Sequence, residues 1–503
     1  MSIDPLTETA SSLQTKLTAG TITSKQLIDV YLGQLARHNG YLKAVIETAP
    51  ESLLYAKATE LDNERQQGHL RSPLHGIPLI VKDNIATVPE LGLQTTCGSY
   101  ALEGSKPRKN AVAIDRLIAA GAIVLGKANL SSRSDRADQG WSAVGGQAQS
   151  PYVRGGFQRD TDSYSGHSSA GGSSTGSATG VAAGFAPISL GTETRGSLIM
   201  PSDRAALYTI KPTVKIISQA GVIPASYVAD SVGPIAKTSL DVADLLDILV
   251  DPSKTTIPNG GYRSAVTGDW GDIRIGYVDS ETWIFPHRIV KYVKEASNQM
   301  FREFELAYEK LKTVVKVVKP IEMMTLEEST EYGKTDIGKA FLKSFEGDLR
   351  GYLSGLDESK IHSLADLIEF NKAHPDLELP IAASNQAGLE RMLNYDMTDE
   401  EYDRIVRTAR EVNKAGIDRV LEENAIDIIM APGESLMFEI PAAAGYPTAS
   451  LPLGYLDYNG RPFGLQMLAK AHQEAMLVQA QSAWEATFPA RQSPPLDEIN
   501  PQT

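Results

Sequence analysis

A glycine- and serine-rich stretch near the middle of the chain, residues 171–177, constrains the fold more than any other feature. It reads Gly-Gly-Ser-Ser-Thr-Gly-Ser and leads into the apolar run 181–190. A solvated linker would not continue into such a run, so the stretch predicts a small-residue segment packed against a buried sheet. A second motif, Gly-Thr-Glu-Thr-Arg-Gly-Ser, follows at once over residues 191–197.

Two serines in these motifs and one upstream lysine can form a proton relay without histidine. Lys82 follows the segment Gly-Ile-Pro-Leu-Ile-Val, and Ser173 and Ser197 lie in the two glycine-rich motifs. A serine hydroxyl is a weak nucleophile that needs a neighbouring base, and lysine can serve only in its neutral form. A second serine can pass the proton because a hydroxyl both donates and accepts. Adjacent glycines let backbone N–H groups approach a developing oxyanion.

This set of motifs resembles the amidase signature family of serine hydrolases. The resemblance extends over nearly the whole chain, and the closest likeness is to the branch that contains the bacterial peptide amidase and fungal relatives. Besides the three motifs above, it is carried by residues 95–99, 211–213, 230–234, 445–447 and 451–454, and for the branch by residues 189–194, 221–224 and 362–371.

The resemblance implies a role for each of these residues. Ser197 would be the nucleophile, Ser173 a relay residue beside a cis peptide bond, and Lys82 the base. The oxyanion hole would consist of the backbone N–H groups of Thr194, Arg195, Gly196 and Ser197. Because this relay supplies both acid–base and nucleophilic chemistry, no metal and no organic cofactor is expected.

The hydrophobic pattern agrees with an α/β fold. We expect a strand over 78–81 that delivers Lys82 at its end, a helix over 111–120 and a strand over 122–125, with further strands over 273–278, 314–318 and 426–430. A capping box at Thr23 and Gln26 predicts the start of a helix. Strand–helix alternation indicates a sheet covered by helices on both faces. The resemblance implies the amidase signature fold, a large mixed sheet in one domain over 1–503, with a variable helical cover at about 320–400. Residues 489–503 are expected to form a tail.

Arg195 is the sharpest departure from the family pattern, which has glycine there, or aspartate in the peptide amidase-like branch. Its side chain either faces the substrate pocket or turns away, to solvent or to an acid such as Glu193 or Asp203. Residues 132–136, 225–230 and 381–386 also depart from the pattern, which indicates an altered pocket around an intact catalytic core. We expect substrate contacts from Arg195, Tyr227, Asp230 and Gln386.

Other titratable residues offer weaker candidates for chemistry. His167 precedes the serine-rich loop, but no Gly-x-Ser-x-Gly elbow with a following Asp and His accompanies it. Cys97 is the single cysteine, which excludes an internal disulfide, and is expected to be a small buried residue. No His-Glu-x-x-His or paired-cysteine motif indicates a metal site.

The net charge of −14 disfavours binding to nucleic acid or to an anionic membrane surface. The first residues lack the pattern of a signal peptide, and no run approaches the roughly 20 apolar residues that span a bilayer. We therefore expect a cytoplasmic enzyme with a small-molecule amide as its partner; a homodimer is left open.

The leading hypothesis is hydrolysis of a small-molecule or peptide-like amide through an acyl-enzyme on Ser197. The altered pocket keeps open an amidase-fold enzyme that performs acyl transfer or cyclisation. A catalytically silent binding protein is a weaker alternative, since Lys82, Ser173 and Ser197 are all present. The glutaminase subunit of a tRNA amidotransferase is weaker still, because it would require partner subunits and the resemblance is to a stand-alone branch.

Overall fold

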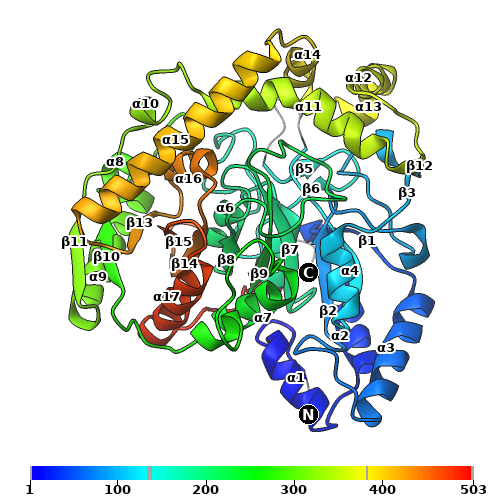
Figure 1. Ribbon diagram of the computed structural model, residues 1–503. Helices are drawn as coiled ribbons and strands as arrows, with labels where there is room; N and C mark the ends of the chain where they lie inside the picture. The colour runs from blue at the N-terminus through cyan, green and yellow to red at the C-terminus, as the bar shows by residue number, and fades with distance from the viewer. Residues whose placement is uncertain (1–2, 133–138, 381–382, 500–503) are drawn as a thin grey trace.

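The computed structural model describes residues 3–132, 139–380 and 383–499 (Figure 1). Its centre is one eleven-stranded mixed sheet in the order β1-β4-β2-β7-β9-β8-β14-β15-β13-β10-β11. These strands are β1 (Val45–Thr48), β4 (Ile123–Ala128), β2 (Pro78–Lys82), β7 (Ile188–Glu193), β9 (Ser231–Ala236), β8 (Tyr208–Lys211), β14 (Thr448–Tyr455), β15 (Pro462–Leu468), β13 (Ile428–Pro432), β10 (Arg274–Tyr277) and β11 (Val317–Pro320).

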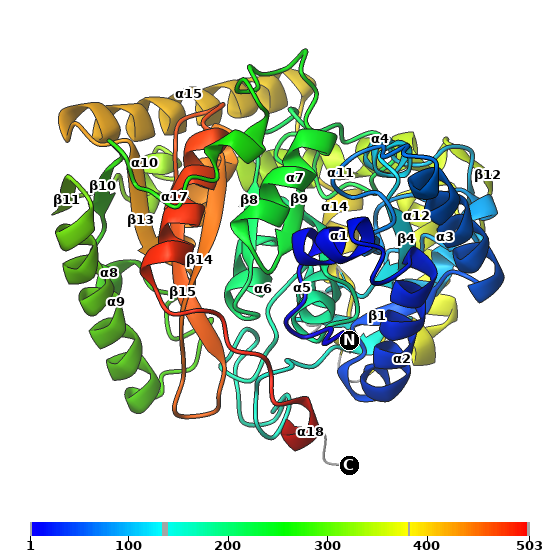
Figure 2. The same ribbon diagram turned by 90° about the horizontal axis from the view of Figure 1, so that it is seen from below.

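Helices cover both faces of the sheet, as expected. Strand β9 shows this by its alternation: Val232 and Ala236 join the core cluster that holds α7 (Ser239–Leu249) and α17 (Glu474–Thr487). Ile235 points the other way, into the cluster of α5 (Thr175–Ala182). The short helix α6 (Ile199–Asp203) contacts α5 and the strands β8, β14 and β15. Seen from below, α7 and α17 lie in front of the central strands (Figure 2).

The strands that carry the predicted relay are neighbours. Strand β2 pairs in parallel with β4 on one side and with β7 on the other. The carboxyl ends of β2 and β7 therefore meet at one edge of the sheet, where β2 ends at Lys82. The predicted strand over 78–81 and the helix over 111–120, observed as α4 (Val112–Ala119), are confirmed, as is the capping box of α2 (Ser24–Leu42).

The region expected as a variable helical cover is mostly helical. We call these helices the cap: α10 (Leu326–Ser329), α11 (Ile337–Leu353), α12 (Leu364–Ala373), α13 (Pro375–Glu378) and α14 (Ala387–Leu393). In Figure 1, α11 to α14 lie together along the top of the view. A short strand that the sequence did not predict, β12 (Leu356–Glu358), pairs with β3 (Lys106–Pro107) and attaches the cap to the body.

The remaining elements complete the outer layers. They are α1 (Ala10–Thr18), α3 (Glu51–Gln66), α8 (Ser280–Trp283), α9 (Lys294–Val314), α15 (Asp399–Glu423), α16 (Glu439–Ala444), α18 (Leu496–Ile499), the short strands β5 (Trp141–Ser142) and β6 (Gly146–Gln147), and the 3₁₀ turns η1 (Pro89–Leu91), η2 (Tyr100–Leu102), η3 (Tyr262–Ala265) and η5 (Leu436–Phe438). Among the described helices, none has the length and apolar character needed to cross a membrane.

One predicted boundary was wrong, and the expected tail includes a short helix. The strand expected over 314–318 starts at Val317, because α9 continues to Val314. The expected tail contains α18, whose Leu496 and Ile499 face one side of a helical turn and pack into the main core. Residues 133–136 and 381–382, in two of the segments that depart from the family pattern, lie outside the described residues.

Candidate active site

Lys82 lies at the centre of a buried hydrogen-bonded group. Its side chain is buried, and Nζ lies 2.7 Å from Ser173 Oγ, 3.1 Å from Ser174 Oγ and 3.1 Å from the Thr192 carbonyl oxygen. Thr192 is near the end of β7, so the parallel pairing of β2 and β7 brings its carbonyl to Lys82. These contacts hold the amine against the Ser173 hydroxyl.

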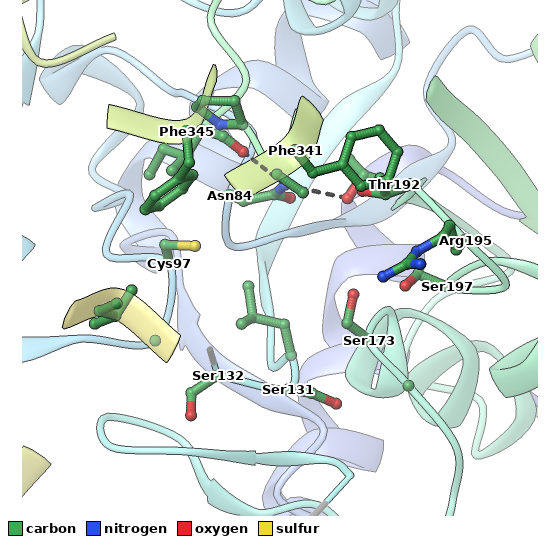
Figure 3. Close-up of a pocket in the computed structure, with 18 of the residues that line it drawn as sticks. Asn84, Cys97, Ser131, Ser132, Ser173, Thr192, Arg195, Ser197, Phe341 and Phe345 are labelled. Atoms are coloured by element: carbon green, nitrogen blue, oxygen red, sulfur yellow. Dashed lines mark hydrogen bonds between the residues drawn. The ribbon is translucent and has the colours of Figure 1, made fainter. Parts of the chain in front are cut away.

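The loops that carry the two serines are bound to each other. The Gly172–Ser173 peptide is cis, and α5 begins two residues later. The Ser174 N–H donates to the Ser197 carbonyl oxygen at 3.1 Å. Ser173 and Ser197 line the same cavity, and Figure 3 shows their hydroxyl groups pointing toward each other. The structure therefore brings Lys82, Ser173 and Ser197 together, as the resemblance implied.

The turn 194–197 is held in place by the side chain of the residue before it, Glu193. The Glu193 carboxylate accepts hydrogen bonds from the N–H groups of Leu198, at 2.6 Å, and Ile199, at 3.1 Å. Gly196 has a φ of +73°, and a Cβ there would meet the Phe438 ring at 2.9 Å. Only glycine fits this position without strain and without a shift of Phe438.

The N–H groups of Thr194, Arg195, Gly196 and Ser197 donate to no acceptor among the described residues. Gly196 is buried and Thr194 and Ser197 are partly buried, and buried backbone donors are rarely left without a partner. A row of N–H donors beside the Ser197 hydroxyl is the kind of site that stabilises a developing negative charge.

Arg195 lines the cavity and is also paired with an acid. Its Nη1 donates to Glu439 Oε2 at 3.0 Å, and the guanidinium lies over the Phe341 ring at 5.4 Å from the centroid. Burial raises the pKa of the Glu439 carboxyl, while Arg195 opposes this shift. Glu439 thus replaces the acids considered from the sequence, Glu193 and Asp203, as the partner, and offsets the positive charge within the cavity.

The other predicted substrate contacts have different positions. Asp230 lines the cavity, but its carboxylate accepts from Thr194 Oγ1 at 2.5 Å and from two backbone N–H groups of the 225–226 segment. Gln386 also lines it, with its amide bonded to Asn371 and to the Ile368 carbonyl. Tyr227 is not part of the lining, and its hydroxyl donates to the Val222 carbonyl at 3.0 Å. Asp230 and Gln386 therefore shape the wall, and Tyr227 stands behind it.

Cys97 differs from its expected position. It is only partly buried and lines the cavity, with its thiol directed into it (Figure 3).

The cavity is large and mostly apolar. Its volume is about 620 Å³, and it reaches two hydrophobic clusters. One lies between the cap and the body and includes Phe345, Leu349 and Leu389. The other includes Phe285 and Phe438. An amide has an acyl group on one side and an amine on the other. With a hydrophobic cluster at each of two places, the cavity can hold an apolar group on both sides of the amide.

His167 belongs to a separate buried charge cluster. Arg461 Nη2 donates to His167 Nδ1 at 2.9 Å, and burial with the adjacent Arg461 lowers the pKa of His167 to about 4. Glu434 pairs with both Arg461 and Arg204, and Arg204 donates to the carbonyls of residues 165, 166 and 169. This cluster supports the loop that leads to Ser173, and His167 does not line the catalytic cavity.

Sequence reasoning missed Ser174, Thr192 and Glu439. Ser174 and Thr192 stand beside predicted residues in the two motifs, so the motifs themselves could have indicated them. Glu439 is 244 residues from Arg195, and nothing local marks it. Across the described parts of the chain, no group of three or more His, Cys, Asp or Glu side chains is placed to hold a metal ion.

Comparison with known proteins places the chain among amidases. The family model described as Amidase matches residues 26–440. An Arabidopsis thaliana protein described as a probable amidase is 33% identical over 94% of this chain and 88% of its own length. The crystal structure of peptide amidase from Stenotrophomonas maltophilia superposes with a TM-score of 0.83 and 33% identity, covering 98% of this chain and 99% of that one. A Chloroflexus aggregans protein, one of the subunits of glutamyl-tRNA(Gln) amidotransferase, is 28% identical over 95% of this chain and 96% of its own length.

Proposed function

The chain belongs to the amidase signature family, in its peptide amidase-like branch, and hydrolyses amide C–N bonds; we propose that it does so through an acyl-enzyme on Ser197, with Ser173 and Lys82 as the proton relay. The observation that carries this proposal is the 2.7 Å contact between Lys82 Nζ and Ser173 Oγ beside the Ser197 hydroxyl.

In the first step, neutral Lys82 accepts the proton of Ser173 while Ser173 accepts the proton of Ser197. Ser197 Oγ forms a bond to the amide carbonyl carbon, and the carbonyl oxygen becomes an oxyanion. The N–H groups of residues 194–197 have no other acceptor in the described protein and stabilise this charge.

In the second step, the proton returns through Ser173 to the amine nitrogen as the C–N bond breaks. The amine leaves, and the acyl group stays on Ser197 as an ester. A water molecule then gives its proton to the relay and attacks the ester carbonyl. The acid is released, and Ser197 and Lys82 regain their starting forms.

Turnover in water labelled with oxygen-18 tests hydrolysis against acyl transfer. We expect each released acid molecule to carry one labelled oxygen atom, because water opens the ester. A neutral apolar amide and glutamine should be assayed side by side, since glutamine is the substrate expected of an amidotransferase-like enzyme. An unlabelled coupled or cyclised product would instead establish the acyl-transfer alternative.

Arg195 is proposed to recognise an uncharged oxygen of the substrate near the scissile carbonyl. Its Nη1 is bonded to Glu439, and its other N–H groups have no partner among the described residues. Because Glu439 offsets the charge, the arrangement favours a carbonyl or hydroxyl oxygen over a carboxylate. A hydrogen bond of this kind contributes about 0.5–1.5 kcal/mol.

We therefore expect Arg195→Ala to lower kcat/KM on a peptide-like amide about three- to ten-fold. Arg195→Asp should lower it further, because it sets a second carboxylate beside Glu439. Arg302→Ala is the matched control, since Arg302 is an exposed arginine on α9 with a glutamate beside it, away from the cavity. Equal kcat/KM values for all four proteins would exclude Arg195 from substrate recognition.

A further inference from the structure

Glu378 is a buried carboxylate in the wall of the catalytic cavity that the proposed mechanism does not use. It ends α13, is only 8% exposed, and lines the same cavity as Ser197. Glutamate is almost never this buried in proteins unless it is paired. Its surroundings therefore indicate what it binds.

The protein satisfies one oxygen of this carboxylate. Ser99 Oγ donates to Oε1 at 3.0 Å, and the Tyr100 N–H donates to the same atom at 2.7 Å. No hydrogen bond from a described side chain reaches Oε2. The two bonds orient the carboxylate, and neither of them uses Oε2.

No basic residue in the described part of the chain forms an ion pair with Glu378. Lys360 is directed to the Tyr100 carbonyl and to Glu103. His374 stacks on Phe370, with Nδ1 at the Phe370 carbonyl oxygen. Burial raises the pKa of the Glu378 carboxyl, and hydrogen bonds from Ser99, Tyr100 and the Ala101 N–H, together with the nearby His374, oppose the shift. The described part of the chain thus supplies Glu378 with hydrogen bonds and a nearby histidine, but with no lysine or arginine partner.

A second acceptor belongs to the adjoining helix α12. Asn371 also lines the cavity, and its Nδ2 donates to Gln386 while its Oδ1 is buried without a hydrogen-bond partner. Helices α12 and α13 contact each other, and α12 also contacts α14. Glu378 and Asn371 thus lie on neighbouring helices of one cavity wall, and the carboxylate favours a ligand group that carries N–H bonds.

The wall around these polar groups is apolar. Leu102, Phe345, Leu349, Ile361, Leu367 and Leu389 line the cavity and belong to the hydrophobic cluster of the cap. A ligand that reaches from Ser197 to Glu378 must therefore be apolar along its length and polar at its end. The net charge of −14 would also favour the approach of a cation.

We propose that the substrate is an amide whose apolar chain ends in a protonated amine, and that Glu378 binds this ammonium group in the cap; the inference rests on the amide hydrolysis proposed for Ser197. A charge-assisted hydrogen bond forms between the ammonium and Glu378 Oε2.

The test compares two series of straight-chain acyl amides that differ only at the far end, one ending in a primary amine and the other in a methyl group. We expect kcat/KM of the native enzyme to favour the amine series at least ten-fold at one chain length. Glu378→Gln keeps an oxygen for Ser99 and Tyr100 but has no charge. This variant should lose the preference and retain its rate on the methyl series, which also confirms that it folds.

Glu378→Asp provides a readout that a purely structural role would not change. Its carboxylate is withdrawn by one methylene, so the preferred amine substrate should become one carbon longer. If Glu378→Gln lowers kcat/KM equally on both series, or if the native enzyme prefers the methyl series, the ammonium site is excluded while amide hydrolysis stands.

A binding assay separates this inference from the proposed mechanism. Ser197→Ala, which cannot form the acyl-enzyme, should bind n-hexylamine more tightly than 1-hexanol in calorimetry, and adding Glu378→Gln should abolish the difference. If the native enzyme cleaves neither series but this difference is observed, the mechanism fails and the site stands. Equal binding of the amine and the alcohol would overturn the site.

Discussion

Ser197→Ala should lower kcat for amide hydrolysis by about 10⁴- to 10⁶-fold, because removal of the nucleophile disables a catalytic group that acts as a unit. The substitution should alter little else. The Ser197 carbonyl that accepts from Ser174 belongs to the backbone and is retained, as are the N–H groups of residues 194–197. Substrate should still bind. Across a panel of amides, the Kd values of the variant should therefore follow the same order as the KM values of the native enzyme.

A fluorophosphonate probe supplies an independent measurement. It should label the native protein on Ser197 and leave Ser197→Ala unlabelled, as read by mass spectrometry of the digested protein. Ser218→Ala is a suitable control, since Ser218 lies outside the cavity lining and, among the described residues, its hydroxyl is bonded to the Ala220 N–H alone. Turnover by Ser197→Ala above about 1% of the native rate would contradict an acyl-enzyme on this residue.

The central sheet and the three proposed catalytic residues could be predicted because each rests on a local pattern. The strand that ends at Lys82 is a short apolar run after Gly-Ile-Pro, and both serines lie in glycine-rich motifs. Such motifs constrain the backbone within a few residues, and the parallel pairing of β2 and β7 then brings them together. The family resemblance also indicated the approximate place of the cap.

The walls of the cavity could not be predicted in the same way. Arg195 meets Glu439 and Phe341, and Glu378 meets Ser99 and Tyr100, across separations of more than a hundred residues. The contacts of Phe341 and Glu378 depend on how the cap docks on the body, and that of Glu439 depends on how α16 packs beside the turn 194–197, which no periodicity encodes. Tyr227 illustrates the limit: its segment adjoins the cavity through Ala225, but its own side chain turns to the Val222 carbonyl.

Polar residues in the cavity wall also differ in what remains available to a ligand. The Asp230 carboxylate is used by Thr194 and by the backbone of the 225–226 segment, so its role is to hold the turn that carries Ser197. The bonds from Ser99 and Tyr100 to Glu378 use Oε1, and neither of them uses Oε2. The residue type alone does not show which of these two acids can bind a ligand, whereas their hydrogen bonds do.

Lys82→Met should reduce kcat by about 10³- to 10⁵-fold, because the unbranched apolar side chain fills similar space but accepts no proton. Ser173 would then have no base within reach, and the Ser197 hydroxyl would have to attack without losing its proton. If the three residues act as one relay, adding Ser197→Ala to Lys82→Met should cost almost nothing further, which kinetics of the double variant will measure.

Lys127→Met is the matched control for this experiment. Lys127 is a second buried lysine, on the neighbouring parallel strand β4, and its Nζ binds the Ile85 carbonyl at 2.5 Å and Thr95 Oγ1 at 3.0 Å, outside the cavity. Its replacement should lower thermal stability and leave kcat of the folded fraction near the native value. A similar loss of kcat in both lysine variants would mean that removing either buried amine disturbs the sheet. A selective loss in Lys82→Met, together with non-additivity toward Ser197, would instead identify Lys82 as the base, because a structural contribution would add to the effect of removing the nucleophile.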